Sequence, residues 1–167
     1  MKTEFPDGLK RDAVLCILKS RGRTLMLLRN KEPNMGKMQP VGGKIEACES
    51  PYDAAVRETF EETGQKVTNF RYCGMLVETS PVKYNWTVFV YQAETNLFEP
   101  LPCNEGELMW IDENDIDNYP IPETDKFLFR YINEHKTFMF SAAYNAELKL
   151  LELCEEIENK VVYHNPL

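Results

Sequence analysis

Residues 50–64 carry a helix-start signal at one end and a helix-stop signal at the other. Ser50 supplies a side-chain oxygen that can cap the first turn, and Pro51 stands at the first helical position, where no backbone donor is lost. Gly64 provides the usual stop, because glycine readily adopts the left-handed backbone conformation that follows a helix. The sequence therefore predicts a helix of about thirteen residues from 51 to 63.

Three glutamates of this helix share one face. Glu58, Glu61 and Glu62 are spaced i, i+3 and i+4, so their side chains project together. Each like-charge pair at this spacing costs about 0.2 to 0.5 kcal/mol in an isolated helix. A hard divalent cation would offset that cost, and Mg²⁺ commonly bridges carboxylates to substrate phosphates. A solvated acidic face is the alternative interpretation, since such faces are common.

The glutamates belong to a longer pattern, G-x5-E-x7-R-E-U-x-E-E-x-G-U, in which U is a bulky aliphatic residue. Its seven fixed positions, matched over 23 residues, are Gly43, Glu49, Arg57, Glu58, Glu61, Glu62 and Gly64. This pattern resembles the signature of the Nudix hydrolases. Thr59 and Gln65 depart from it at the two aliphatic positions. Both are packing positions in the family, so the departure concerns core contacts and leaves the chemistry intact.

The resemblance implies a fold and an activity. The fold is the α/β Nudix fold, a mixed β-sheet sandwiched between α-helices. The activity is hydrolysis, dependent on Mg²⁺ or Mn²⁺, of a nucleoside diphosphate linked to another moiety. The cations would bridge the phosphate chain, neutralise its charge and acidify or position a water for in-line attack. A carboxylate would take the water's proton.

The resemblance also implies roles for individual residues. The metal ligands would be Gly43, through its backbone carbonyl, Glu58, Glu61 and Glu62. Glu58 is alternatively the general base. Arg57 would pair with Glu49 and hold the loop against the helix. An ordinary surface side chain is the other interpretation of Arg57, because exposed arginine is common.

Three charged residues other than those at the fixed positions of the pattern are further candidates. Glu105 precedes the segment that contains Trp110, where the family often recruits one more acid to bind a cation or act as base. Lys44 directly follows the double glycine and Arg29 ends the second predicted strand, so both are candidates for phosphate contacts. Solvated surface charges are the alternative for each of them.

A looser similarity covers about residues 12–155. Segments 25–31, 104–106 and 122–129 are similar to the MutT-related branch, which cleaves oxidised purine nucleoside triphosphates. This implies conversion of 8-oxo-dGTP, or a related nucleotide, to the monophosphate and pyrophosphate, which cleanses the precursor pool.

Base recognition in that branch requires an apolar or aromatic cavity with a few polar groups. Gln39 offers an amide donor and acceptor, Asp125 can accept purine N–H groups, and Phe127 is a candidate for stacking. The alternatives are respectively an exposed loop amide, a first-turn residue favoured by the helix dipole, and a core aromatic. For Phe127 we favour core packing, because aromatic residues at helical spacing usually pack inward.

Two other functions remain open. One is Nudix hydrolysis of a dinucleoside polyphosphate, ADP-ribose or a nucleotide sugar, since the loops that choose the substrate lie outside the pattern. The other is a non-catalytic Nudix-fold regulator that binds nucleotides. Retention of Arg57 and the three glutamates disfavours this second function.

The rest of the chain alternates between extended and helical segments. Strands are predicted at 12–20, 24–28, 38–41, 67–79, 84–94 and 107–112, with the double glycine at 42–43 breaking the third. A second helix is predicted from 122 to about 133, and 138–144 with 147–154 as a last hairpin, although the latter segment could be helical. The lead 1–11 and the tail 157–167 receive no element, because chain ends are often poorly ordered.

The composition of the chain limits the kinds of partner that it can bind. The 167 residues carry a net charge of −8, which disfavours binding to a nucleic-acid polymer. The longest apolar run, 13–18, is too short to span a membrane, and the first residues lack a signal-peptide core. Five cysteines without a C-x-x-C pair indicate neither a disulfide framework nor a zinc site. We therefore expect one domain over 1–167, cytoplasmic, monomeric or homodimeric, with a small nucleotide as its partner.

Overall fold

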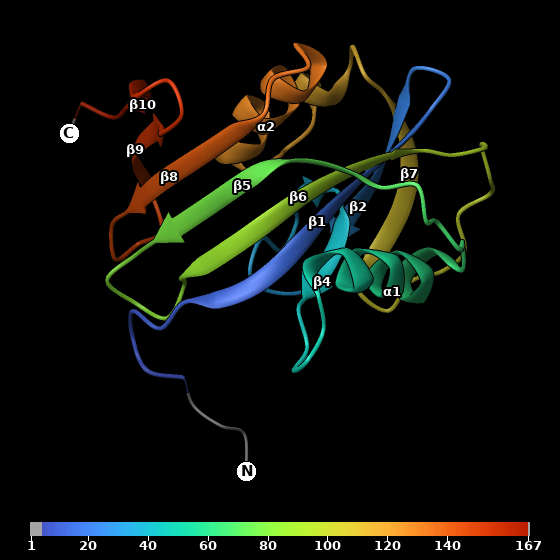
Figure 1. The fold of residues 1–167 in the computed structure, drawn as a ribbon, viewed down its shortest axis with the longest axis horizontal. Helices are drawn as coiled ribbons and strands as arrows, with labels where there is room; N and C mark the ends of the chain where they lie inside the picture. The colour runs from blue at the N-terminus through green and yellow to red at the C-terminus, as the bar shows by residue number, and fades with distance from the viewer. Residues whose placement is uncertain (1–4, 167) are drawn as a thin grey trace.

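A ten-stranded mixed sheet is the framework of the structure, a computed structural model that describes residues 5–166 (Figure 1). Its strands are β1 (Arg11–Ser20), β2 (Arg23–Arg29), β3 (Met38–Gln39), β4 (Val41–Lys44), β5 (Arg71–Thr79), β6 (Trp86–Glu94), β7 (Gly106–Asp112), β8 (Phe138–Tyr144), β9 (Leu150–Glu155) and β10 (Lys160–His164). The helices are α1 (Pro51–Thr63), a short 3₁₀ turn η1 (Ile116–Asn118) and α2 (Glu123–Asn133). Positions 1–4 of the lead segment and position 167 of the tail lie outside the described residues.

β1 organises the sheet. The strand order is β10-β9-β8-β5-β6-β1-β2-β3, with β4 also paired to β1 and β7 to β2. β1 runs parallel to β6 on one side, and on the other it pairs antiparallel with β2 only at residues 19–20. Residues 13–16 of β1 pair instead with β4. The sheet therefore divides beside β1, and β4 enters at that point.

The prediction that Gly42 and Gly43 break the strand is wrong. Both lie within β4, where they pair with Leu15 and Val14 of β1. A Cβ on Gly42 would lie 2.1 Å from the carbonyl oxygen of Val14. Glycine at this position therefore permits the close approach of the two strands.

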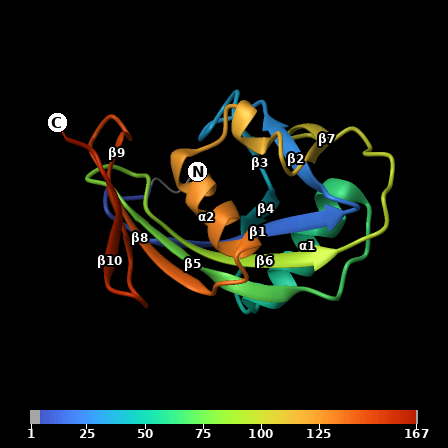
Figure 2. The ribbon, with the colours of Figure 1, turned by 90° about the horizontal axis from the view of Figure 1, so that it is seen from above.

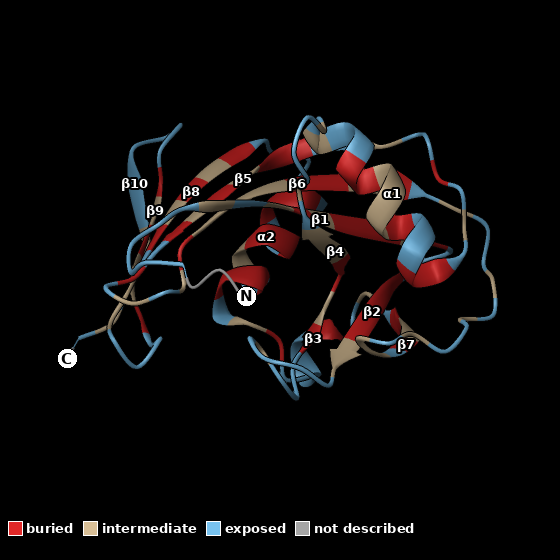
Figure 3. Ribbon diagram, turned by 90° about the horizontal axis from the view of Figure 1, so that it is seen from below, coloured by how far each residue is buried: buried red, intermediate tan, exposed pale blue. Residues whose placement is uncertain are grey.

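The two helices cover opposite faces of the sheet (Figure 2). α1 has the predicted bounds and caps: Ser50 accepts a hydrogen bond from the Asp53 amide, and Gly64 has a φ of 71°. α1 buries Ala54 and Ala55 against β1, and α2 buries Leu128 and Ile132 against the other face. Buried residues accordingly occupy the inner sides of both helices (Figure 3). None of the helices in the described residues is long and apolar enough to span a bilayer.

The C-terminal strands extend the sheet beyond β5. β8 pairs in parallel with β5, and β9 follows as a strand, so the helical alternative for residues 147–154 is wrong. β10, which the sequence analysis did not assign, pairs with β9. Glu155 is fully buried and accepts hydrogen bonds from the amides of Ile157 and Glu158, which fixes the turn between these two strands. Glu155 also accepts a hydrogen bond from the Met139 amide, which links β9 to β8.

Candidate active site

The three glutamates of α1 lie along the side of the helix nearest β4. Glu62 is buried, and its carboxylate accepts a hydrogen bond of 2.9 Å from the amide of Gly42. The pKa of Glu62 is raised to about 8, chiefly by burial, and the charges of Glu58 and Glu105 add to the effect. Glu61 is exposed. The acidic face therefore runs from the protein interior to solvent.

Glu58 occupies the space beside Gly43. A Cβ at position 43 would lie 2.4 Å from the carboxylate carbon of Glu58. Burial raises the pKa of Glu58, and the hydrogen bond from Arg57 opposes that effect. A larger residue at position 43 would displace this carboxylate, so Gly43 is needed for the local geometry.

Arg57 connects the acidic face to the loop before α1. Its Nε and Nη2 donate to the two oxygens of Glu49, each at 2.8 Å, so the predicted pair is confirmed. Its Nη1 donates to Glu58 at 2.7 Å, and its Nη2 also donates to the carbonyl of Lys44 at 2.9 Å. The hydrogen bonds from Arg57 lower the pKa of Glu49 to about 2. One guanidinium thus fixes the loop, the end of β4 and Glu58 together.

Glu105 reaches the same site from the loop before β7. Because Arg29 of β2 pairs with Gly106 of β7, the register places Glu105 beside Arg29. The Nη1 of Arg29 lies 3.1 Å from the Glu105 carboxylate, and the Nζ of Lys31 lies 3.8 Å from it. The charge of Glu105 raises the pKa of both Glu58 and Glu62. The structure therefore brings this predicted acid to the acidic face.

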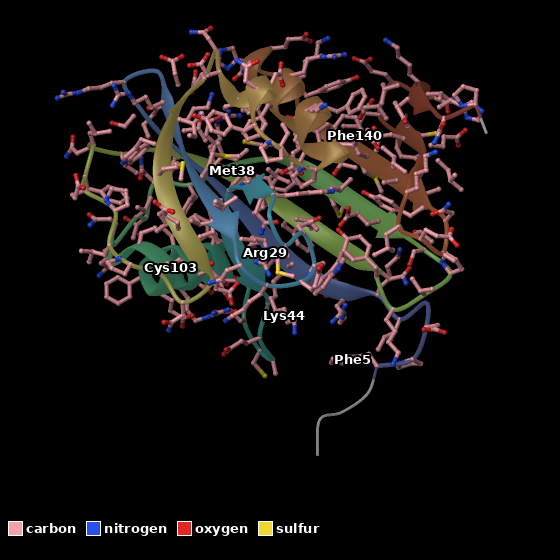
Figure 4. The ribbon with its side chains drawn as sticks, turned by 180° about the vertical axis from the view of Figure 1, so that it is seen from behind. Phe5, Arg29, Met38, Lys44, Cys103 and Phe140 are labelled. Carbon is pink, nitrogen blue, oxygen red and sulfur yellow. The ribbon has the colours of Figure 1, made fainter. Side chains whose placement is uncertain are left out.

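A cavity of about 670 Å³ opens over these residues. Its lining includes Arg29, Lys31, Gly43, Lys44, Arg57, Glu58, Glu61 and Glu105. The lining also includes residues that lie mostly on β5, β6 and α2, namely Asn34, Gln39, Leu76, Glu78, Tyr84, Trp86, Val88, Thr124 and Asp125. Arg29 and Lys44, both predicted to contact phosphate, lie on the same side of the molecule, away from Phe140 (Figure 4).

Two of the three residues predicted to contact the base line the cavity, and the third does not. Asp125, at the start of α2, is 6% exposed, and burial chiefly raises its pKa to about 8. Gln39 also lines the cavity, and its amide oxygen accepts a hydrogen bond of 3.4 Å from Asn34. Phe127 does not line the cavity: its ring packs edge-on against Tyr163, with ring centres 6.1 Å apart. Phe127 packs against the core cluster, in agreement with the interpretation that the sequence analysis favours for it.

The sequence analysis missed Glu78, Tyr84 and Trp86. Glu78 is 5% exposed, and it faces Trp86 in the pairing of β5 with β6. A signal was present in the sequence, since Glu78 lies two residues after Leu76, on the same face of a strand as apolar residues. A carboxylate in such a position is rarely buried without a role.

Comparison with known proteins identifies the family. The sequence profile of the NUDIX domain matches residues 9–135. The chain belongs to the Nudix family. The Nudix hydrolase YvcI of Bacillus subtilis, which is uncharacterized, is 29% identical over 146 residues, covering 81% of this chain and 88% of YvcI. This Nudix chain is therefore a pyrophosphohydrolase.

Solved structures confirm the Nudix fold. A MutT mutator protein from Bacillus halodurans has a TM-score of 0.78 and 25% identity, covering 88% of this chain and 98% of its own. The NUDIX domain of NrtR from Shewanella oneidensis, solved with ADP-ribose, has a TM-score of 0.66 and 16% identity, covering 75% of this chain and 88% of its own. The latter likeness shows the fold alone.

Nudix hydrolases generally use divalent metal ions, so we tested whether the acidic face fits one. Among residues 5–166, no three His, Cys, Asp or Glu side chains already form a group that would hold an ion. The donor chemistry fits a hard cation, because Glu58 lies against Gly43 and the carboxylates of Glu61 and Glu105 line the same cavity. Burial chiefly raises the pKa of Glu62, and the charges of Glu58 and Glu105 add to it, so a bound cation would favour the ionised form. Gly43, Glu58, Glu61 and Glu62 are therefore the residues that would hold the metal.

Proposed function

We propose that this Nudix hydrolase cleaves a nucleoside triphosphate, specifically 8-oxo-dGTP or a related oxidised purine nucleotide, to the monophosphate and pyrophosphate. The observation that carries the proposal is that two kinds of residue line one cavity. Cations and carboxylates on and around α1 and β4 contribute to the lining, and so do two buried carboxyls, amides and an indole, which we take as the base end of the cavity. Such a lining suits a molecule that combines a polyphosphate with a polar aromatic base.

In the proposed reaction, Arg29 and Lys44 bind phosphate oxygens. Glu58 or Glu105 accepts a proton from the attacking water, since both carboxylates line the cavity. Arg57 acts through Glu58 and the loop, which it positions by the hydrogen bonds described above. Mg²⁺ or Mn²⁺, when bound by the glutamates, supplies charge neutralisation along the phosphate chain and lowers the pKa of water.

The base end of the cavity supports a purine. Asp125 and Gln39 line it, and both can accept N–H groups of a purine edge. The likeness to the Bacillus halodurans MutT protein is consistent with this substrate class. Because nucleoside triphosphates are made and used in the cytoplasm, we place the proposed activity there.

Initial rates on 8-oxo-dGTP, dGTP, ADP-ribose and a diadenosine polyphosphate would test the proposal, with product analysis for pyrophosphate. The proposal predicts the highest kcat/KM for 8-oxo-dGTP. Equal rates on 8-oxo-dGTP and dGTP would refute the oxidised-base assignment. A preference for ADP-ribose or the diadenosine compound would instead indicate another Nudix substrate.

A further inference from the structure

Glu78 is a buried carboxylate at the base end of the cavity, fixed by two tyrosines. The Tyr84 hydroxyl lies 3.2 and 3.1 Å from its two oxygens, and the Tyr144 hydroxyl lies 2.8 Å from Oε1. The two rings also pack edge-to-face, with centres 5.7 Å apart. Both hydroxyls donate to the carboxylate, which has about four acceptor positions. Glu78 is therefore held in one orientation while acceptor capacity remains.

Glu78 lies at the wall of the cavity, and Tyr84 and Asp125 also line it. The charge of Glu78 contributes to the raised pKa of Asp125, so these two carboxyl groups are close enough to interact. Trp86, the register partner of Glu78, adds an indole to the same wall. This end of the cavity thus combines a ring surface with two carboxyl groups.

One part of this arrangement comes from outside the region that the family profile matches. Tyr144 belongs to β8, whereas the match ends at residue 135. β8 reaches Glu78 because it pairs in parallel with β5, with Glu78 opposite Ala142. β8 therefore contributes a hydrogen-bond donor to Glu78, a residue that lines the cavity.

We propose that Glu78, oriented by Tyr84 and Tyr144, accepts an N–H hydrogen bond from the nucleobase and so selects bases that present a donor at that edge. This inference rests on the proposed function, in that it takes the cavity to hold a nucleotide. An oxidised purine suits the site, because its 8-keto form carries an N7–H donor where guanine has an acceptor. A base with an acceptor at that edge would face a fixed carboxylate and be rejected.

Calorimetric binding of 8-oxo-dGMP, dGMP, dAMP and dCMP tests the role of Glu78 without requiring turnover. Glu78→Gln retains the size of the side chain but can both donate and accept, so it should tolerate the wrong base edge. In the wild type, the Kd for 8-oxo-dGMP should be lower than the Kd for the weakest ligand by about tenfold or more. In Glu78→Gln, most of this difference in Kd should be lost. Glu152→Gln, on β9, is the matched control and should keep the preference.

Tyr144→Phe provides a second variant, in case Glu78→Gln is poorly folded. It removes one donor from Glu78, so KM for the preferred triphosphate should rise severalfold while kcat stays within about twofold. Tyr163→Phe, on β10, is its control. Wild-type base ranking in both Glu78→Gln and Tyr144→Phe would overturn the inference, as would a wild-type protein that binds all four monophosphates equally. Selective binding without triphosphate hydrolysis would overturn the proposed function and leave the role of Glu78 standing.

Discussion

Arg57 holds Glu49 by two parallel hydrogen bonds of 2.8 Å while its third nitrogen contacts Glu58 at 2.7 Å. The planar guanidinium can make both sets of contacts at once because its donors are arranged as a fork. Glu58 lines the cavity, whereas Glu49 lies in the loop before α1. Arg57 therefore orients the Glu58 carboxylate, and its other hydrogen bonds hold the loop before α1.

Arg57→Lys should reduce kcat about 10- to 100-fold, because an ammonium group keeps the charge and loses the fork. Steady-state kinetics with a nucleoside triphosphate would measure the change, and circular dichroism would confirm that the variant is folded. Arg71→Lys, an exposed change on β5, is the control. Activity of Arg57→Lys within twofold of the wild type would show that the fork has no role in positioning Glu58.

The two glycines of β4 should differ in their response to alanine. Gly43→Ala places a methyl group against the Glu58 carboxylate, a side chain that can move, so activity should fall while the fold persists. Gly42→Ala places it against the Val14 carbonyl, which belongs to the backbone, so stability should fall by about 2 kcal/mol or more. Thermal melts and rates of both variants would measure this. The account would be contradicted if Gly43→Ala were fully active.

Thr59→Val should stabilise the protein by about 1 kcal/mol, which corresponds to about 2–4 °C in Tm. Thr59 is fully buried in α1, and its hydroxyl lacks a hydrogen-bond partner of normal geometry, although it lies near the weakly polar Cys16 thiol. Valine has the same shape and restores the aliphatic residue that the family pattern calls for. Differential scanning calorimetry of wild type and variant would measure the shift; an unchanged or lower Tm would show that the hydroxyl is satisfied.

Much of α1 was predictable because its signals are local. The cap at Ser50, the proline after it and Gly64 specify both ends within the segment itself. The spacing of the glutamates likewise predicts the acidic face from helical geometry. The role of Gly42 in β4 was not predictable in this way, because the contact that requires glycine comes from β1, which is distant in the sequence.

The base end of the cavity depends on similar long-range pairings. Glu78 meets Tyr144 only because β5 and β8 pair in parallel, and no local pattern specifies which strands become neighbours. For Phe127, helical spacing predicted a core position. The spacing did not predict that Tyr163 of β10 would pack against its ring. The sequence therefore predicts the acidic face of α1 better than the part of the cavity around Glu78.

Asp125 should make stability depend on pH. The pKa of Asp125 in the folded protein is about 8, above the ordinary value of 3.8. Its contribution to the free energy of unfolding is therefore fully present below pH 3.8 and is lost as the pH rises through about 8. Asp125→Asn removes this titration. The Tm of the wild type minus that of the variant should therefore decrease between about pH 5 and pH 9. A constant difference over this range would show that Asp125 does not titrate there.

Pyrophosphate release from 8-oxo-dGTP by the wild type and by Glu62→Gln, each with Mg²⁺ and with excess chelator, tests the central claim most directly. Glu62→Gln removes the buried carboxylate charge and retains the shape of the side chain. We expect metal-dependent release by the wild type, loss with the chelator, and a rate at least about 100-fold lower in a folded Glu62→Gln variant. Release that persists in the chelator, or a variant as fast as the wild type, would contradict the assignment of the acidic face as the metal-binding catalytic centre.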